Sequence, residues 1–465
     1  MVSTDAFIAA NRFGLGPLPL ELSVIEKNPR AWLKRQISTE SKTPLRLQNL
    51  PSVAEIMRTY IRNRQQGNRG QGNQGSGNRS SGMNFRQQQK QFYTDTLYAR
   101  TLTMVETSRP FAEHMVSFWS NHFTVSNAGR KIIGPIAVAY ETNAIRPHIF
   151  GNFEDMLNAV AHHPTMLLYL QNHISMGANS AMALKPRGNS RGRARARGLN
   201  ENLAREIMEL HTLGVNGGYT QNDVTEFAKV ITGWSMGGRG GGPEDANGFR
   251  FKRWMHEPGP KTVLGQVFEG GGESEGINAL KMLAHHPSTA KFIATKLVRH
   301  FVSDTPPASA IAKIEKVFSQ SQGDLAKVSE ALIDLEEAWQ EPLSKTKRPY
   351  ELVISTYRAL GIKPPNKKQF LKALGELHHT PFKAASPAGW SDKAEDWLTP
   401  ETLMRRIEWT RTLAAKLPRS VKPEELFADT IGAVASPQTK LWVSRAPSAE
   451  EAIALILASP EFQRR

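Results

Sequence analysis

The stretch NENLAREIMELHTLGVNGGYTQNDV, residues 200–224, indicates the fold more clearly than any other part of the chain. Its apolar residues recur every three or four positions, which predicts a helix. Gly214 is typical of the residue that follows a helix C-terminus, and Thr220 with Asp223 three residues later resembles the capping box of a second helix. The sequence therefore predicts two helices joined by a tight corner.

The same stretch contains polar groups that suggest a site. At about 100° per residue, Glu206 and His211 lie about 140° apart, on the two edges of an apolar helix face. Unlike the two histidines of an H-E-x-x-H helix, they do not share a face, so a metal site would need ligands from other helices. Glu206 and His211 are candidate acid/base groups or ligands; the alternative is that they only fill and neutralise a buried face.

Helical spacing continues through most of the chain, with Pro, Ser or Asp at many helix starts. LNAVAHHPTMLLYL and LKMLAHHPSTAKFI predict helices that end at a histidine pair, before Pro164 or Pro287 opens the next helix. GFRFKRW followed by KTVLGQVF, residues 248–268, alternates with period two and predicts a small β-hairpin. We expect a mostly α fold, a multihelical single-unit array with a small β-hairpin, in one domain over residues 1–465.

Three polar, glycine-rich or arginine-rich segments interrupt the helical pattern. They cover residues 64–84, 185–198 and 236–248, and they contain too few apolar side chains to offset the entropy of ordering. Because all three interrupt otherwise helical sequence, we expect disordered surface loops on one scaffold rather than linkers between domains.

The formal net charge of +16 comes largely from two of these regions. Residues 62–86 contain five arginines and residues 185–198 contain six basic residues, and neither region contains an acid. Aromatic residues that would stack on bases are not interleaved with the arginines, so weak nucleic-acid binding is the most that this pattern indicates.

The chain has no cysteine, which leaves His, Asp and Glu as metal ligands. No run of 18 apolar residues predicts a membrane span. Asp5 stands where a signal peptide would carry positive charge, so the sequence as written predicts a cytoplasmic protein.

Two further segments place polar side chains among aromatic ones. FAEHMVSFWSNHF carries His114, Asn121 and His122, and RFKRWMHEPGPKTVLG carries His256 and Lys261. We hypothesise a hydrolase-like enzyme with a His/Glu site between helices; no cofactor is evident, although a divalent metal would suit these residues. In this hypothesis Asn121 orients substrate and His256 with Lys261 neutralises an anionic ligand. The acid/base groups, which are also the potential metal ligands, are Glu206, His211 and His122.

The chain resembles a bacterial family known as domain of unknown function 1800. The motifs that carry the resemblance include NRFGLGP, FWSNHFTVS, ELHTLGVNGGYTQ, HEPGPKTVLG and GWSDKAEDWLTPETLMRR, in the family's order over nearly the whole length. The resemblance implies a single, mostly helical unit without an established reaction. It also implies a sulfatase-like protein encoded nearby and envelope association, so the alternative function is a non-catalytic partner or assembly factor for such a protein.

Overall fold

The computed structural model describes residues 3–38, 43–60, 80–185, 198–237 and 248–465. Within these ranges the chain is mostly α-helical with two small antiparallel sheets, which confirms the predicted fold class. Each of the three segments predicted as loops lies mostly outside the described residues. The first predicted loop, 64–84, extends too far, because helix α6 already begins at Ser80; adding turns to an existing helix costs little compared with nucleating one.

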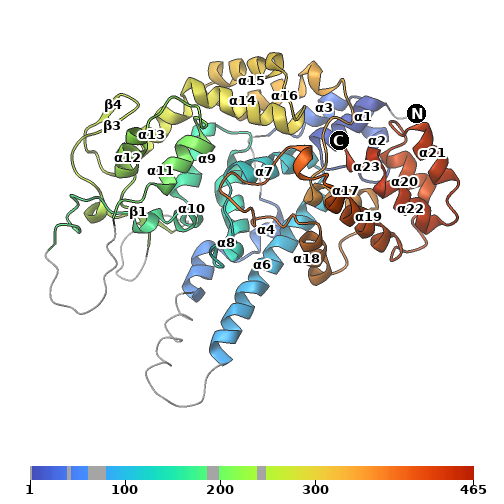
Figure 1. The fold of residues 1–465 in the computed structure, drawn as a ribbon, viewed down its shortest axis with the longest axis horizontal. Helices are drawn as coiled ribbons and strands as arrows, with labels where there is room; N and C mark the ends of the chain where they lie inside the picture. The colour runs from blue at the N-terminus through green and yellow to red at the C-terminus, as the bar shows by residue number, and fades with distance from the viewer. Residues whose placement is uncertain (1–2, 39–42, 61–79, 186–197, 238–247) are drawn as a thin grey trace.

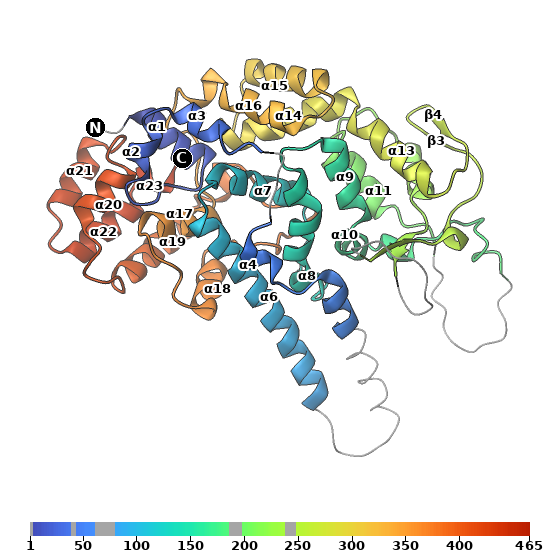
Figure 2. The same cartoon turned by 180° about the vertical axis from the view of Figure 1, so that it is seen from behind.

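Helices from the first half of the chain lie at the centre and along one end of the molecule (Figures 1 and 2). They include two π-helical segments, which contain one more residue per turn than an ordinary helix pattern predicts. The bounds are α1 (Thr4–Ile8), η1 (Ala9–Phe13, π), α2 (Glu21–Ile25), α3 (Pro29–Lys34), α4 (Leu45–Gln48), α6 (Ser80–Glu106), α7 (Pro110–His122), α8 (Ile133–Tyr140), η2 (Glu141–Ile145, π), η3 (Arg146–His148), α9 (Phe153–His162), α10 (Pro164–Tyr169) and η4 (Asn172–Ile174).

The second half of the chain begins near the β-strands at one end and finishes beside α1 to α3 at the other (Figure 1). Its helices are α11 (Asn202–Glu206), η5 (Ile207–His211, π), α12 (Gln221–Val230), η6 (Arg253–Met255), α13 (Glu273–Ala284), α14 (Pro287–Phe301), α15 (Ala308–Gln320), α16 (Leu325–Ile333), η7 (Glu336–Ala338), α17 (Pro349–Ala359), α18 (Lys367–Glu376), η8 (Ala394–Asp396), α19 (Pro400–Ala414), α20 (Pro423–Thr430), α21 (Pro437–Ser444), α22 (Ala449–Ala458) and α23 (Pro460–Gln463).

The predicted helical corner is present, with one difference. Gly214 has a φ of 81° and Thr220 forms a capping box with Asp223 at the start of α12. The helix before the corner, however, changes from α to π at Ile207, so the angular spacing expected for an α-helix does not hold up to His211.

Both His-His-Pro motifs form the predicted helix junctions. In each motif the proline opens the new helix, and the second histidine is its N-cap residue. The Nδ1 atom of His163 accepts from the backbone N–H of Thr165 at 3.2 Å, and that of His286 accepts from Ser288 at 3.1 Å. These imidazoles therefore satisfy helix N-terminal amides, as serine or aspartate does elsewhere.

The strands pair differently from the expected hairpin. β2 (Phe249–Phe251) pairs with the earlier β1 (Trp234–Met236), and β3 (Lys261–Val263) pairs with β4 (Gln266–Phe268). The turn between β3 and β4 consists of Leu264 and Gly265, both with positive φ, which matches the twist of a two-residue hairpin. KTVLGQVF therefore forms a hairpin by itself, and GFRFKRW finds its partner elsewhere.

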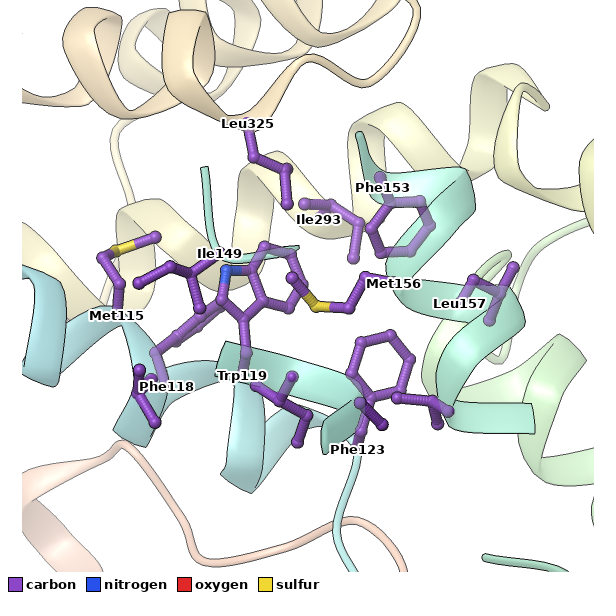
Figure 3. Packing of buried hydrophobic residues seen from close by; sticks show 14 of the residues in the cluster. Met115, Phe118, Trp119, Phe123, Ile149, Phe153, Met156, Leu157, Ile293 and Leu325 are labelled. Carbon is purple, nitrogen blue, oxygen red and sulfur yellow. The ribbon is translucent and has the colours of Figure 1, made fainter. Parts of the chain in front are cut away.

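The main core lies between α7, α9, α14 and α16 (Figure 3). Trp119 of α7 is fully buried at its centre, and Figure 3 shows Met156, Ile149 and Ile293 around the indole. Apolar contacts of this density fix the relative positions of α7 and α14. The same packing fixes the positions of the polar side chains that these two helices carry, His114 on α7 and His300 on α14.

Candidate metal centre

The structure brings together two of the predicted site residues, His122 and His211. Their ring centroids are 6.1 Å apart, and His122 Nε2 donates to the backbone carbonyl of His211 at 3.1 Å. Burial, reinforced by the charge of Lys296, lowers the pKa of His211 to about 3 and that of His122 well below its usual value. The Nδ1 atom of each ring is buried without a hydrogen-bond partner. The pair therefore consists of two neutral imidazoles.

Glu206 does not join this pair. Among the described residues, no hydrogen bond or ion pair links Glu206 to His122 or His211. Burial, followed by the charge of Glu209, raises the pKa of Glu206 to about 7. Such a pKa suits a general base, but its environment is a separate half-buried position where its charge helps to raise the pKa of Tyr169 to about 12.

Asn121 uses both ends of its amide to hold a backbone segment. Its Nδ2 donates to the carbonyl of Trp390 at 2.8 Å, and its Oδ1 accepts from the N–H of the same residue at 2.8 Å. With both polar atoms engaged, the Asn121 side chain holds the Trp390 segment in this conformation. Asn121 also lines a small cavity, and its role in orienting a substrate stays a prediction.

His256 and Lys261 form a third, separate group with Glu275. Lys261 Nζ donates to Glu275 at 2.9 Å and lies 3.3 Å from His256 Nε2, while His256 Nδ1 lies 2.9 Å from the Thr232 carbonyl. All three side chains are buried. Because Glu275 neutralises Lys261, the cation predicted to bind an anionic ligand already has a partner.

A different set of residues forms the most concentrated group of ligand-type side chains. His114 of α7, His300 of α14 and Glu351 of α17 are all buried, and one potential ligand atom from each lies within 4.8 Å of the others. His114 Nε2 is 2.9 Å from His300 Nε2 and 3.8 Å from Glu351 Oε1. Within the described residues this is the one such group of three or more.

The protonation of the two imidazoles follows from their outer partners. His114 Nδ1 lies 2.9 Å from the carbonyl of Phe13, and His300 Nδ1 lies 2.7 Å from the carboxylate of Asp392. Both partners accept hydrogen bonds, so we assign the proton of each neutral ring to Nδ1. Both Nε2 atoms then carry lone pairs, and these lone pairs face one another across 2.9 Å.

This arrangement is repulsive unless a cation lies between the two nitrogens. Burial lowers the pKa of His114 and lowers that of His300 to about 3, even though the charge of Asp392 opposes the shift at His300. A proton is therefore held weakly near neutral pH. Two neutral imidazoles and a carboxylate are a ligand set that suits a transition-metal ion.

The distances are compatible with a metal ion after small side-chain shifts. Two nitrogens bonded to one ion at about 2.05 Å lie about 2.9 Å apart when the bonds meet at a right angle. The hydrogen bonds from each Nδ1 to a carbonyl or carboxylate are those that orient metal-bound histidines. His114, His300 and Glu351 can thus hold a metal ion.

Two guanidinium groups act against this assignment. Arg348 donates to Glu351 Oε1 through Nε at 2.8 Å and Nη2 at 2.6 Å. Arg465 lies 3.5 Å from Glu351 Oε2 and 3.5 Å from His114 Nε2. Burial opposes ionisation of Glu351, but the two arginines outweigh it and hold the pKa of Glu351 well below its usual range. Glu351 is therefore ionised, as a ligand must be, but it would have to share an oxygen with Arg348.

A small cavity adjoins the cluster on the Glu351 side. Its volume is about 40 Å³, and its lining includes Glu351, Arg348, Tyr350, His379 and Trp390. Trp390 Nε1 is buried without a hydrogen-bond partner. A cavity of this volume has room for water molecules, which need roughly 10–15 Å³ each on this measure, and the side chains of Glu351, Arg348 and His379 offer polar atoms in its lining.

A family model described as protein of unknown function (DUF1800) matches residues 8–464. The chain belongs to the DUF1800 family. Neither a curated protein nor a solved structure matches it. The expected resemblance is thus confirmed, while the sulfatase-like partner and the envelope association stay predictions.

The structure also tests the expectation that this DUF1800 protein has no membrane-spanning helix. No helix in the described ranges combines the length and apolar character needed to cross a bilayer. The two arginine-rich regions predicted to bind nucleic acid weakly, 62–86 and 185–198, lie largely outside the described residues, so that expectation also stays a prediction.

Sequence reasoning missed most of this cluster in the DUF1800 chain. His114 was singled out with its aromatic neighbours, but His300 is 186 residues further along the chain and Glu351 belongs to another helix. Only the fold brings them together. The sequence likewise does not show that Asp392, in the segment GWSDK, faces His300.

Proposed function

We propose that His114, His300 and Glu351 bind one divalent transition-metal ion, and that this DUF1800 protein is a metal-dependent hydrolase. The observation that carries the proposal is the pair of Nε2 atoms 2.9 Å apart, on two imidazole rings whose Nδ1 atoms each face a hydrogen-bond acceptor. Two histidines and a glutamate are also a ligand set of hydrolytic zinc enzymes.

The water-sized cavity beside Glu351 supports the hydrolytic class. A divalent ion bound by three protein side chains retains a position for water and lowers the pKa of that water towards neutrality. Arg348 lines the cavity and supplies a buried positive charge next to Glu351. Such a charge would stabilise the oxyanion that develops when water attacks an ester or phosphate.

Metal analysis tests the centre directly. Wild-type protein produced with Zn²⁺, Mn²⁺ and Fe²⁺ should retain about one ion per chain after dialysis, and H300A should retain less than about a tenth of that amount. H163A is the matched control, because His163 is also buried, has its pKa lowered by burial to about 3, and lies outside both histidine groups. Equal metal content in all three proteins, or no metal in the wild type, would overturn the proposal.

Folding defects are separated by a second measurement on the wild type alone. Replacing the bound ion by Co²⁺ should produce visible absorption bands of a nitrogen- and oxygen-ligated ion, which a chelator removes while the far-ultraviolet circular dichroism stays unchanged. If metal binds but model phosphate and carboxylate esters are not hydrolysed, the centre stands and the hydrolase assignment falls.

A further inference from the structure

A second feature, outside the histidine cluster, has the composition of a ligand site. An open pocket of about 710 Å³ lies between α6, the turn at residues 127–131, α18 and the segment 380–383. Ligand pockets commonly have volumes of about 300–1,000 Å³. Helices α6 and α18 lie side by side in both views (Figures 1 and 2). Its lining includes Lys90, Tyr93, Lys131, Leu371, Thr380 and Lys383.

Three lysines and no carboxylate line this pocket. Lys90, Lys131 and Lys383 come from three different elements, all are exposed, and none forms an ion pair with a described residue. The nearby acids of α6 and α18 are already engaged, since Asp95 pairs with Lys367 and Glu376 pairs with Lys372. Three positive charges around one concave surface attract an anion from solution.

The remaining lining favours an organic anion over a simple inorganic ion. Most of the pocket surface is apolar, and it includes the ring of Tyr93 and the side chain of Leu371. Lys383 Nζ lies 5.6 Å from the centroid of the Tyr93 ring, so charge and aromatic surface are adjacent. A ligand with a charged end and an apolar or aromatic body would use both.

The wall of the pocket is held in place by hydrogen bonds. Tyr93 Oη donates to the carbonyl of Pro381 at 2.9 Å, and the N–H of Asn127 donates to the carbonyl of Phe382 at 2.8 Å. Ser126 Oγ donates to the carbonyl of Ala384 at 2.7 Å. Because these bonds fix the segment that carries Lys383, a ligand would find the charges already arranged.

We propose that this pocket binds a multiply charged organic anion of about the size of a nucleoside diphosphate, with Lys90, Lys131 and Lys383 neutralising its charge. The site does not depend on the metal centre. The two are nonetheless adjacent, because Thr380 and Lys383 line the outer pocket while Pro381 and Phe382 line the 40 Å³ cavity beside Glu351. The segment of residues 380–383 thus contributes to both the anion pocket and the small cavity beside Glu351.

Calorimetric titration with ADP, citrate and adenosine tests the proposal. ADP or citrate should bind to the wild-type chain, adenosine should bind at least about tenfold more weakly than ADP, and added salt should weaken binding of the anions. The triple variant K90Q/K131Q/K383Q should bind the same anion at least about tenfold more weakly. Preference for ADP would identify a phosphate ligand, and preference for citrate would identify a polycarboxylate.

The matched control is K281Q/K291Q/K316Q, which removes the same charge from exposed lysines that form no ion pair with described residues and lie outside the pocket. It separates the pocket from general attraction to a basic protein. Equal affinity of wild type and K90Q/K131Q/K383Q, an equal loss in the control, or equal binding of adenosine and ADP would overturn the proposal. Chelation of metal should leave ADP binding unchanged, so failure of the metal centre is distinguishable.

Discussion

Single buried side chains in this protein have strongly shifted proton affinities, and the direction of each shift depends on its nearest partners. Burial opposes the ionisation of Asp392 and Glu351, but their partners outweigh it and lower both pKa values: chiefly His300 and Arg348 at Asp392, and Arg348 and Arg465 at Glu351. At Glu206, burial and then the charge of Glu209 outweigh the opposing charge of Arg205 and raise the pKa to about 7. An ionised glutamate thus stabilises the fold at position 351 and destabilises it at position 206.

Glu206 therefore allows a pH-dependent prediction. Its folded pKa is above the unfolded value, so the folded state binds the extra proton, and stability falls as the pH rises from about 4.5 to about 7. E206Q should be more stable than wild type at pH 8 by about 1 kcal/mol, a value reduced for partial exposure, and equal at pH 4.5. Urea unfolding at both pH values measures this.

E330Q is the control for this prediction, because Glu330 is exposed and forms no ion pair with a described residue. Its effect should be small and similar at both pH values. A loss of stability in E206Q at pH 8 would mean that ionised Glu206 has a favourable partner, such as a bound cation, which is the ligand role that the sequence suggested.

The candidate site shows what the sequence does and does not predict at this scale. Residue types and helix positions were sufficient to select His122 and His211, which the fold does place together. Asn121 and Lys261 were selected as groups that contact a substrate or an anionic ligand. In the structure, Asn121 bonds to the backbone of Trp390 and Lys261 bonds to Glu275. A sequence cannot show either contact. His300 was not selected, since its importance comes from a contact made across the core.

At the scale of elements, close helix packing depends on small residues at defined positions. Gly276 in α13 lies against Trp234, and a Cβ atom added there would be 2.0 Å from Cζ2 of the indole. Gly375 in α18 faces open space, with no atom within 4 Å of an added Cβ. Both glycines lie inside helices, but only Gly276 has a neighbour that leaves no room for a Cβ atom.

The substitutions G276A and G375A should accordingly have opposite effects. G276A should lower the free energy of unfolding by about 1–3 kcal/mol through overpacking against Trp234. G375A should raise it by up to about 1 kcal/mol, because alanine loses less backbone entropy in a helix. Thermal and urea unfolding measure both; a stabilising effect of G276A would show that the α13 contact adjusts easily.

Helix boundaries were largely predictable because proline, glycine and capping residues act locally. The starts at Pro110, Pro164 and Pro287 and the capping box at Thr220 illustrate this. The π-helical segments were not predictable, because an extra residue in a turn is tolerated only where tertiary contacts compensate. The pairing of β2 with β1 also depends on contacts outside the local sequence.

At the scale of the molecule, the two chain ends meet through buried arginines. Arg12 donates to the carbonyls of Ala338 and Glu341 and to Ser344 Oγ at 2.7 Å. Arg465 in turn donates to the carbonyl of Arg12 at 3.1 Å. These contacts span the whole sequence, and they support our proposal that residues 1–465 form one folding unit.

Calorimetry should then show a single cooperative transition for the wild type. R12A removes a fully buried side chain and leaves several carbonyls without their donor, so it should destabilise the whole transition by about 3 kcal/mol. R35A, at an exposed arginine of the same region, should change the transition little. A separate early transition in R12A would instead reveal independently folding parts.

The link between the chain ends also has a consequence for biosynthesis. The imidazole pair of His114 and His300 is surrounded by groups from Phe13 to Arg465, and Arg465 donates to the carbonyl of His300 at 3.1 Å. A nascent chain that still has Arg465 inside the ribosome cannot complete this environment. Metal loading of the proposed centre would therefore follow the emergence of Arg465 from the ribosome, and a translation product that stops before Arg465 would lack part of this environment.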